Sequence, residues 1–255
     1  MNEFIKARSP AILLAATTLF CSSPTFAADS GSDWEFGGEI YIWGAAMTAT
    51  TPGGNDSELP FYKILDDLQM TFMGAGGARN DKWSILTDII YLDVKDKVNQ
   101  DRTFPGGSEA EITGDIRLKS WIVTPTVGYA IHNSDKARVE ILGGVRYLWM
   151  KASAEVNLDG LERFNNSVSE SYWDAIIGMR ANFKLNDKWF VPLYFDIGTG
   201  DSDGTWQALA GVGYQFNKFS TTLTYRYLDY NFDSSNEVMA DLAVNGPMLG
   251  ITFIF

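Results

Sequence analysis

Hydrophobic and polar side chains alternate with a period of two residues along most of the chain, from residue 34 to residue 255. The stretches 139–149, 175–183 and 189–197 are clear examples. In the last of these, the apolar face carries Trp189, Val191, Leu193, Phe195 and Ile197. A period of two is typical of β-strands with one apolar face, so the pattern predicts an all-β protein.

The breaks between these stretches fall into two classes. Four are short and rich in Asn and Asp, as is typical of tight turns, at 79–82, 132–136, 186–188 and 217–218. They alternate with five longer breaks, at about 48–68, 98–110, 157–166, 199–204 and 233–241. Nine connections imply ten strands, with eight or twelve as the alternatives. The pattern predicts a transmembrane antiparallel up-and-down β-barrel with short periplasmic turns and longer extracellular loops.

A short motif recurs where strands begin and end. The sequence Asn-Asp-Lys-Trp occurs at 80–83 and again at 186–189, and Asn-Lys-Phe occurs at 217–219. Each is followed by an apolar span and then by an aromatic residue with an Asp, at 91–93, 195–196 and 227–229. We interpret the motif as a hairpin base with an aromatic at each membrane boundary. Chance similarity among amphipathic strands is the alternative.

The first 27 residues have the order of a secretory signal peptide. Lys6 and Arg8 precede an apolar run at 11–20, and a polar stretch ends at Ala27. We expect cleavage after Ala27, which leaves residues 28–255 as a single barrel domain. A buried N-terminal helix is the alternative. Cys21 is the only cysteine, so the mature chain has no thiol for a disulfide or a thiolate metal site.

Composition narrows the classes of partner and of membrane segment. The chain has a formal net charge of −12, which argues against nucleic acid as a partner. No stretch after the signal has the roughly 18 consecutive apolar residues of a spanning helix. Aromatic residues nevertheless make up 14% of the chain, as expected when many strands carry apolar faces.

The C-terminal stretch 246–255 resembles the closing strand of outer-membrane barrels. Such strands end in Phe, with apolar residues at alternate positions before it. The matching positions here are Leu249, Ile251, Phe253 and Phe255. Most of the mature chain resembles small Gram-negative outer-membrane β-barrel proteins, loosely OmpA/OmpW-like, and the stretches that carry this resemblance are 64–68, 211–216 and 225–229. The resemblance implies that the terminal strand is the signal read by the barrel-assembly machinery, with periplasmic chaperones as earlier partners.

Charged residues fall on the face of the strands that we expect to line the lumen. They are Glu39, Asp88, Glu140, Arg146, Asp174, Arg180, Asp196 and Arg226. Counting along the strands from the 132–136 turn predicts that Glu140 pairs with Arg180, and Arg146 with Asp174. The cluster forms either a charged constriction in a pore or a plug of salt bridges that fills the lumen.

Other features suggest little chemistry. Leu59, Ile64, Leu65 and Leu68 could share one face of a helix in the 48–68 loop. The only histidine, His132, falls in a predicted periplasmic turn, far from the outer rim where a catalytic base would be needed. The Asp201–Gly204 stretch lacks the later Glu of an EF-hand loop, and a solvated acidic turn is the simpler interpretation. We expect no enzymatic activity, no cofactor and no metal.

The sequence therefore predicts a non-enzymatic outer-membrane barrel, either structural or a narrow passive pore for small solutes. A surface interaction or adhesion module that uses acidic extracellular loops is one alternative, and a carrier for small apolar solutes is another. Outer-membrane lipid and lipopolysaccharide are the expected partners.

Overall fold

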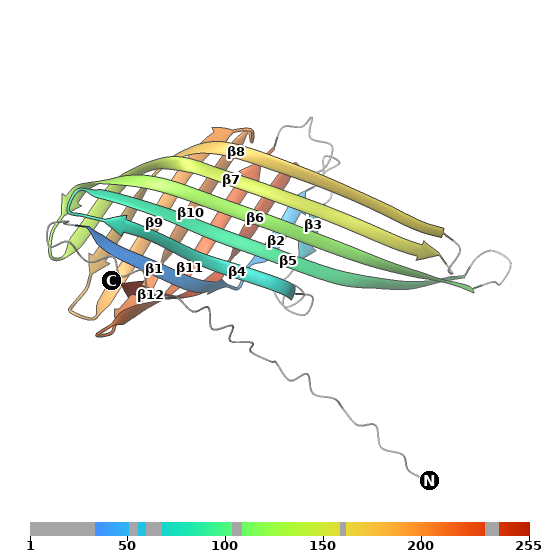
Figure 1. Ribbon diagram of the computed structural model, residues 1–255, viewed down its shortest axis with the longest axis horizontal. Coiled ribbons are helices and arrows are strands. Elements are labelled where there is room, and N and C mark those ends of the chain that lie inside the picture. The colour runs from blue at the N-terminus through green and yellow to red at the C-terminus, as the bar shows by residue number, and fades with distance from the viewer. Residues whose placement is uncertain (1–33, 51–55, 60–67, 104–108, 159–161, 233–239) are drawn as a thin grey trace, which may run out of the picture. The chain divides into compact units, whose positions relative to one another are not determined.

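The computed structural model describes residues 34–50, 56–59, 68–103, 109–158, 162–232 and 240–255 (Figure 1). The predicted signal peptide, residues 1–27, lies outside the described residues, and so does its cleavage site. Residues 33–255 form one compact unit.

The described part of the chain is all-β. Its strands are β1 (Glu35–Trp43), β2 (Ala46–Thr50), β3 (Asp56–Leu59), β4 (Leu68–Arg79), β5 (Trp83–Thr103), β6 (Glu109–Asn133), β7 (Ala137–Leu158), β8 (Glu162–Lys184), β9 (Trp189–Gly200), β10 (Gly204–Gln215), β11 (Phe219–Asn231) and β12 (Asp241–Ile254). From β4 to β12 each strand pairs antiparallel with the next, and β1 pairs with both β4 and β12. The sheet is therefore a closed barrel.

β1 and β2 are two parts of one barrel strand, since both pair with β12. Between them, the Gly44 amide donates to the Pro247 carbonyl at 2.8 Å and keeps the two strands together across the interruption. Counted in this way the barrel has ten strands, as the sequence predicts, and β3 is a short addition that pairs with β2.

The four short turns lie where the sequence predicts them. In two of them an Asn side chain closes the hairpin in the same way. The Asn80 Oδ1 atom accepts hydrogen bonds of 2.9 and 2.7 Å from the backbone amides two and three residues further on. Asn186 repeats this geometry at 2.9 and 2.8 Å. The recurring Asn-Asp-Lys-Trp motif is thus a local turn structure that starts a strand.

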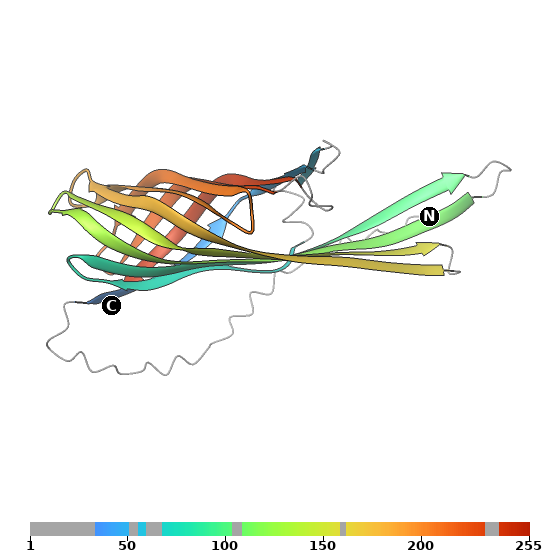
Figure 2. The same ribbon diagram turned by 90° about the horizontal axis from the view of Figure 1, so that it is seen from above.

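Two of the predicted long loops are wrong, because most of their residues belong to strands. β5 and β6 pair continuously from Thr103↔Glu109 downward, and β7 and β8 pair from Leu158↔Glu162. The neighbouring strands stop earlier: β4 reaches only Val94 of β5, and β9 reaches only Asp174 of β8. Strands β5–β8 therefore continue past the barrel as a four-stranded sheet, called here the projecting sheet (Figure 2). The 199–204 break is also shorter than predicted, since β9 ends at Gly200 and β10 begins at Gly204.

The prediction of a helix in the 48–68 loop is wrong for the first and last residues of its apolar face. Leu59 lies on β3 and Leu68 begins β4. Ile64 and Leu65 lie outside the described residues, as do most residues of the 233–241 break. The described part of the chain contains no helix that is long and apolar enough to cross a membrane.

The outward face of the barrel is apolar between two rings of aromatic side chains. Ile40, Ile177, Leu223 and Leu249 are each more than half exposed on this face. The aromatic pairs are Trp83–Tyr129, Trp189–Tyr214 and Phe216–Phe219 at the turn end, and Tyr91–Trp121, Tyr147–Trp173 and Trp206–Tyr227 at the other end. On β5, β6, β10 and β11 the two aromatics lie eight residues apart.

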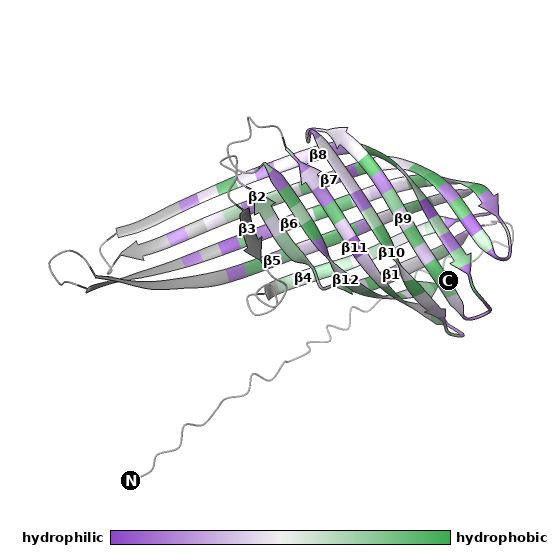
Figure 3. Cartoon of the chain, turned by 180° about the vertical axis from the view of Figure 1, so that it is seen from behind, coloured by the Kyte–Doolittle hydropathy of each residue, from purple (hydrophilic) through white to green (hydrophobic). Residues whose placement is uncertain are grey.

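Eight residues rise about 26 Å along a strand, or about 20 Å along the barrel axis at a tilt of about 40°. This height is close to that of the apolar band of outer-membrane barrels, about 25 Å. Figure 3 shows the corresponding hydrophobic residues on the barrel strands. The alternation of residues thus places one face of each strand against lipid and the other in the lumen.

Candidate functional site

All eight charged residues assigned to the lumen face the barrel interior, and seven of them fall into two groups. The turn-end cluster consists of Ser84, Arg138, Glu140 and Arg180. The central cluster consists of Tyr41, Asp88, Arg146, Asp174, Asp196 and Arg226. Glu39 forms no hydrogen bond to either group among those described and accepts one of 3.2 Å from the Thr222 hydroxyl.

Glu140 is the centre of the turn-end cluster and is only 3% exposed. It lies opposite Arg180 in the register of β7 and β8, as expected from the sequence. The Arg180 Nε and Nη2 atoms donate to Glu140 Oε2 at 2.8 and 2.6 Å, and Arg138 Nε donates to Oε1 at 2.7 Å. Arg180 Nη2 also donates to the Ser84 hydroxyl at 2.8 Å. Two cations therefore hold one carboxylate, and side-chain contacts join β5, β7 and β8 on one wall of the barrel.

Arg226 has a complete set of partners in the central cluster. Its Nη2 atom donates to Asp88 Oδ2 at 2.7 Å, and its Nη1 atom donates to the Tyr41 hydroxyl at 3.1 Å. The Tyr41 hydroxyl in turn donates to Asp88 Oδ1 at 2.6 Å. The Gln207 side-chain oxygen accepts from both Nε and Nη2 of Arg226, and the guanidinium lies 4.8 Å from the centre of the Trp43 ring. These contacts connect β1, β5, β10 and β11.

The predicted ion pair between Arg146 and Asp174 is wrong. The two residues are register partners on β7 and β8, but Arg146 Nη2 forms its ion pair with Asp196 on β9. Asp174 instead accepts hydrogen bonds from the amide and hydroxyl of Ser202, at 3.0 and 2.8 Å. Because the strands are tilted, side chains at the same height in the lumen need not be register partners. Glycine at the inward position 178, next to Asp196 in the register, leaves space for the contact.

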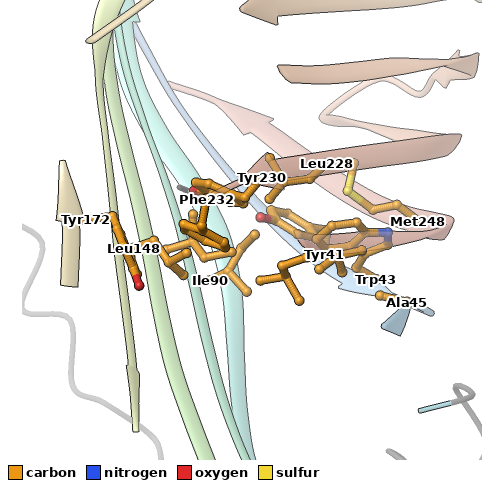
Figure 4. Close-up of a cluster of buried hydrophobic side chains, with 13 residues drawn as sticks. Tyr41, Trp43, Ala45, Ile90, Leu148, Tyr172, Leu228, Tyr230, Phe232 and Met248 are labelled. Carbon is orange, nitrogen blue, oxygen red and sulfur yellow. The ribbon is translucent and has the colours of Figure 1, made fainter. Parts of the chain in front are cut away.

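An apolar cluster fills the lumen beyond the central cluster, on the side away from the short turns (Figure 4). Its members are Tyr41, Trp43, Ala45, Ile90, Ile122, Leu148, Tyr172, Leu228, Tyr230, Phe232, Leu242, Val244 and Met248. The Leu148, Leu228 and Tyr230 side chains are 0% exposed. This cluster was not predicted from the sequence. Its signal is that apolar residues lie two and four positions after Arg146 and after Arg226, on the same inward face.

The remaining candidate residues lie apart from these clusters. His132 is exposed at a turn and contacts the Ser134 hydroxyl at 3.1 Å. In the Asp201–Gly204 turn, Asp201 accepts from the Trp173 amide at 2.9 Å. Within the part of the chain that the structure describes, no three His, Cys, Asp or Glu side chains are close enough to hold a metal ion. The C-terminal residues Leu249, Ile251, Phe253 and Phe255 are all exposed, the first three on the outward face of β12.

Three solved structures with low sequence identity are similar to the chain. Among solved structures, the chain is similar to the translocator domain of autotransporter NalP from Neisseria meningitidis, with 14% identity, 89% of this chain and 90% of that chain covered, and a TM-score of 0.47. It is also similar to Ail, the attachment invasion locus protein of Yersinia pestis (13% identity, 88% and 99% covered, TM-score 0.37). The P. putida toluene transporter TodX is a third (9% identity, 87% and 89% covered, TM-score 0.34).

No curated protein sequence matches the chain. A family model described as outer membrane protein beta-barrel domain matches residues 12–226, which is most of the chain. The closed ten-stranded barrel with an apolar outward face agrees with that match. The chain belongs to the outer membrane protein β-barrel family.

Proposed function

We propose that the protein is a closed, non-enzymatic structural barrel of the Gram-negative outer membrane, exported by means of a cleaved signal peptide, rather than an open passive pore. The observation that carries the proposal is the burial of inward side chains on strands all around the barrel. Arg146, Asp196, Leu148 and Leu228 are 0% exposed, although a water-filled lumen would wet their side chains. Ion pairs and apolar packing together leave these groups without access to water.

The kind of side chain that fills the lumen supports the same proposal. A conducting channel needs polar groups that water and ions can reach along its whole length. Here the carboxylates and guanidinium groups bind one another, and the apolar cluster covers the central cluster on one side. Solute passage would require breaking buried ion pairs and moving several large side chains.

Conductance in planar lipid bilayers tests the closed state. We expect the purified full-length barrel to insert without producing regular conductance steps at moderate voltage. A variant with Leu228→Ala and Tyr230→Ala, which truncates the apolar cluster, serves as the control for detecting opening and should conduct more often. Regular single-channel steps from the unaltered protein would refute the proposal in favour of a pore.

A second candidate function, surface interaction, is favoured by the projecting sheet. β5 has no partner strand on one side beyond Val94, and among the described residues β8 has none on one side over 162–171. Exposed sheet edges are sites where other chains can add a strand. Shortening both hairpins to the height of the other strands should leave barrel folding intact and reduce adherence of expressing cells to epithelial cells. Unchanged adherence would reject this role.

A further inference from the structure

The outward face of the projecting sheet carries a compact group of cations just beyond the outer ring of aromatic side chains, on the side away from the short turns. This group, the basic patch, consists of Lys95, Arg117, Lys119 and Lys151. Among the Lys and Arg side chains that the structure describes, these four are the ones beyond the outer aromatics. The others line the lumen or lie at the short-turn end. These cations are concentrated on one face, although the chain as a whole has a net charge of −12.

The patch lies at the depth of lipid head groups. Lys119 and Arg117 are two and four residues beyond Trp121 on the same face of β6, and Lys151 is two residues beyond Trp149 on β7. Two to four residues correspond to about 7–13 Å along a strand, or about 5–10 Å in height at a tilt of about 40°. Each head-group layer of a bilayer is about 5–8 Å thick, so the ammonium and guanidinium groups reach it.

Two cations of the patch lie directly opposite each other. Lys119 and Lys151 are register partners on β6 and β7, immediately above the opposed pair Trp121 and Trp149. Like charges at opposed positions of an antiparallel pair repel each other and destabilise the sheet. An anion placed between the two ammonium groups would remove this cost.

The carboxylates nearby neutralise only part of the positive charge. Asp93 accepts hydrogen bonds from Arg117 Nε and Nη2 at 2.8 and 2.6 Å and lies 3.7 Å from Lys119 Nζ. The hydrogen bond from Arg117 is the main reason that the pKa of Asp93 lies below its usual value. Lys95 pairs with Asp115 at 3.1 Å. Glu155, the register partner of Asp115, lies on the same face. Four cations against three carboxylates leave an excess of one positive charge, and among the described side chains of the patch Lys151 is the cation that forms no salt bridge.

We propose that Lys119 and Lys151, with Arg117 beside them, bind a phosphate group of an outer-leaflet lipid, such as the phosphorylated glucosamine of lipid A. A lipid is a better match than a free anion, because the site lies on the lipid-facing surface and directly above two indole rings that would contact acyl chains or sugar. Lys and Arg are the usual partners of phosphate oxygens. This site depends on the proposed function only in requiring a barrel inserted in the membrane.

Lipid binding by the full-length barrel in neutral detergent tests the proposal. The probe is diphosphorylated lipid A, with binding followed by native mass spectrometry and by tryptophan fluorescence. We expect Lys151→Glu to weaken binding at least 25-fold, since each basic group near an anionic surface contributes about fivefold and this change also reverses the charge. Lys151→Arg should bind like the unaltered protein. The matched control is Lys188→Glu at the short-turn end, which should also leave binding unchanged.

A stability measurement separates this role from a structural one. Lys151→Glu converts a repulsive pair into an attractive one, so the free barrel should become slightly more stable while lipid A binding is lost. Equal weakening by the Lys188 control, equal binding of dephosphorylated lipid, or displacement by millimolar inorganic phosphate would each overturn the proposal. Conductance is a separate result: a pore that binds lipid A would refute the closed barrel and leave this site in place.

Discussion

Replacement of Arg146 by methionine tests whether the lumen is closed. Methionine keeps most of the side-chain volume but removes the charge, the ion pair with Asp196 and the 3.0 Å hydrogen bond to the Thr205 hydroxyl. Two carboxylates, Asp174 and Asp196, then remain buried, at 1% and 0% exposed, without this cation. Removing one partner of a buried ion pair commonly costs about 3–5 kcal/mol, because the other charge is left uncompensated.

The two partners of this pair should not be equivalent. Asp196→Ala leaves Arg146 with Asp174, its register partner, which can accept the guanidinium after a small side-chain movement. We therefore expect Asp196→Ala to destabilise less than Arg146→Met. The double variant should recover part of the loss caused by Arg146→Met, because one of the two uncompensated carboxylates is gone.

Urea unfolding in lipid vesicles, followed by tryptophan fluorescence and by the heat-modifiable band on cold SDS gels, measures these differences. Arg79→Met is the matched control, since the Arg79–Glu35 pair has side chains 49% and 58% exposed and should contribute only about 0–1 kcal/mol. If Arg146→Met lowers the free energy of unfolding no more than Arg79→Met does, water reaches the central cluster and the lumen is not closed.

Four further predictions use other parts of the molecule. Leu193→Arg, on the outward face, should cost about 2–4 kcal/mol and harm folding far more than Thr222→Arg in the lumen; equal effects on folded yield would mean that the two faces are exchanged. Deletion of Phe255 should lower the folded fraction on cold SDS gels, and an unchanged fraction would remove its assembly role. An epitope tag at Ser134 should be inaccessible in intact cells, whereas antibody labelling there would reverse the orientation. The pKa of Asp93 is lowered in the folded protein, so the ionised carboxylate stabilises the fold above its usual pKa, and this contribution is lost as the pH falls. Asp93→Asn should therefore reduce the change in the free energy of unfolding with pH below about pH 4, and an unchanged loss of stability at low pH would contradict this.

The sequence by itself determined the features that depend on neighbouring residues. The period of two decides which side chains face lipid, because successive side chains of a strand point to opposite faces. Asn80 and Asn186 make their turns through hydrogen bonds to amides two and three residues away, so these turns are also local. Strand number and the inward orientation of Arg146 and Arg226 follow from the same information.

Only the tertiary structure decided how distant strands meet. The pairing of Arg146 with Asp196 depends on strand tilt and on the closing of the sheet, neither of which is encoded in one stretch of residues. The projecting sheet was missed because polar strands outside the membrane have no apolar face, and so no alternation to reveal them. The opposition of Lys119 and Lys151 appears only when β6 and β7 are in register, because a shift of one residue would turn one of the two side chains to the other face of the sheet.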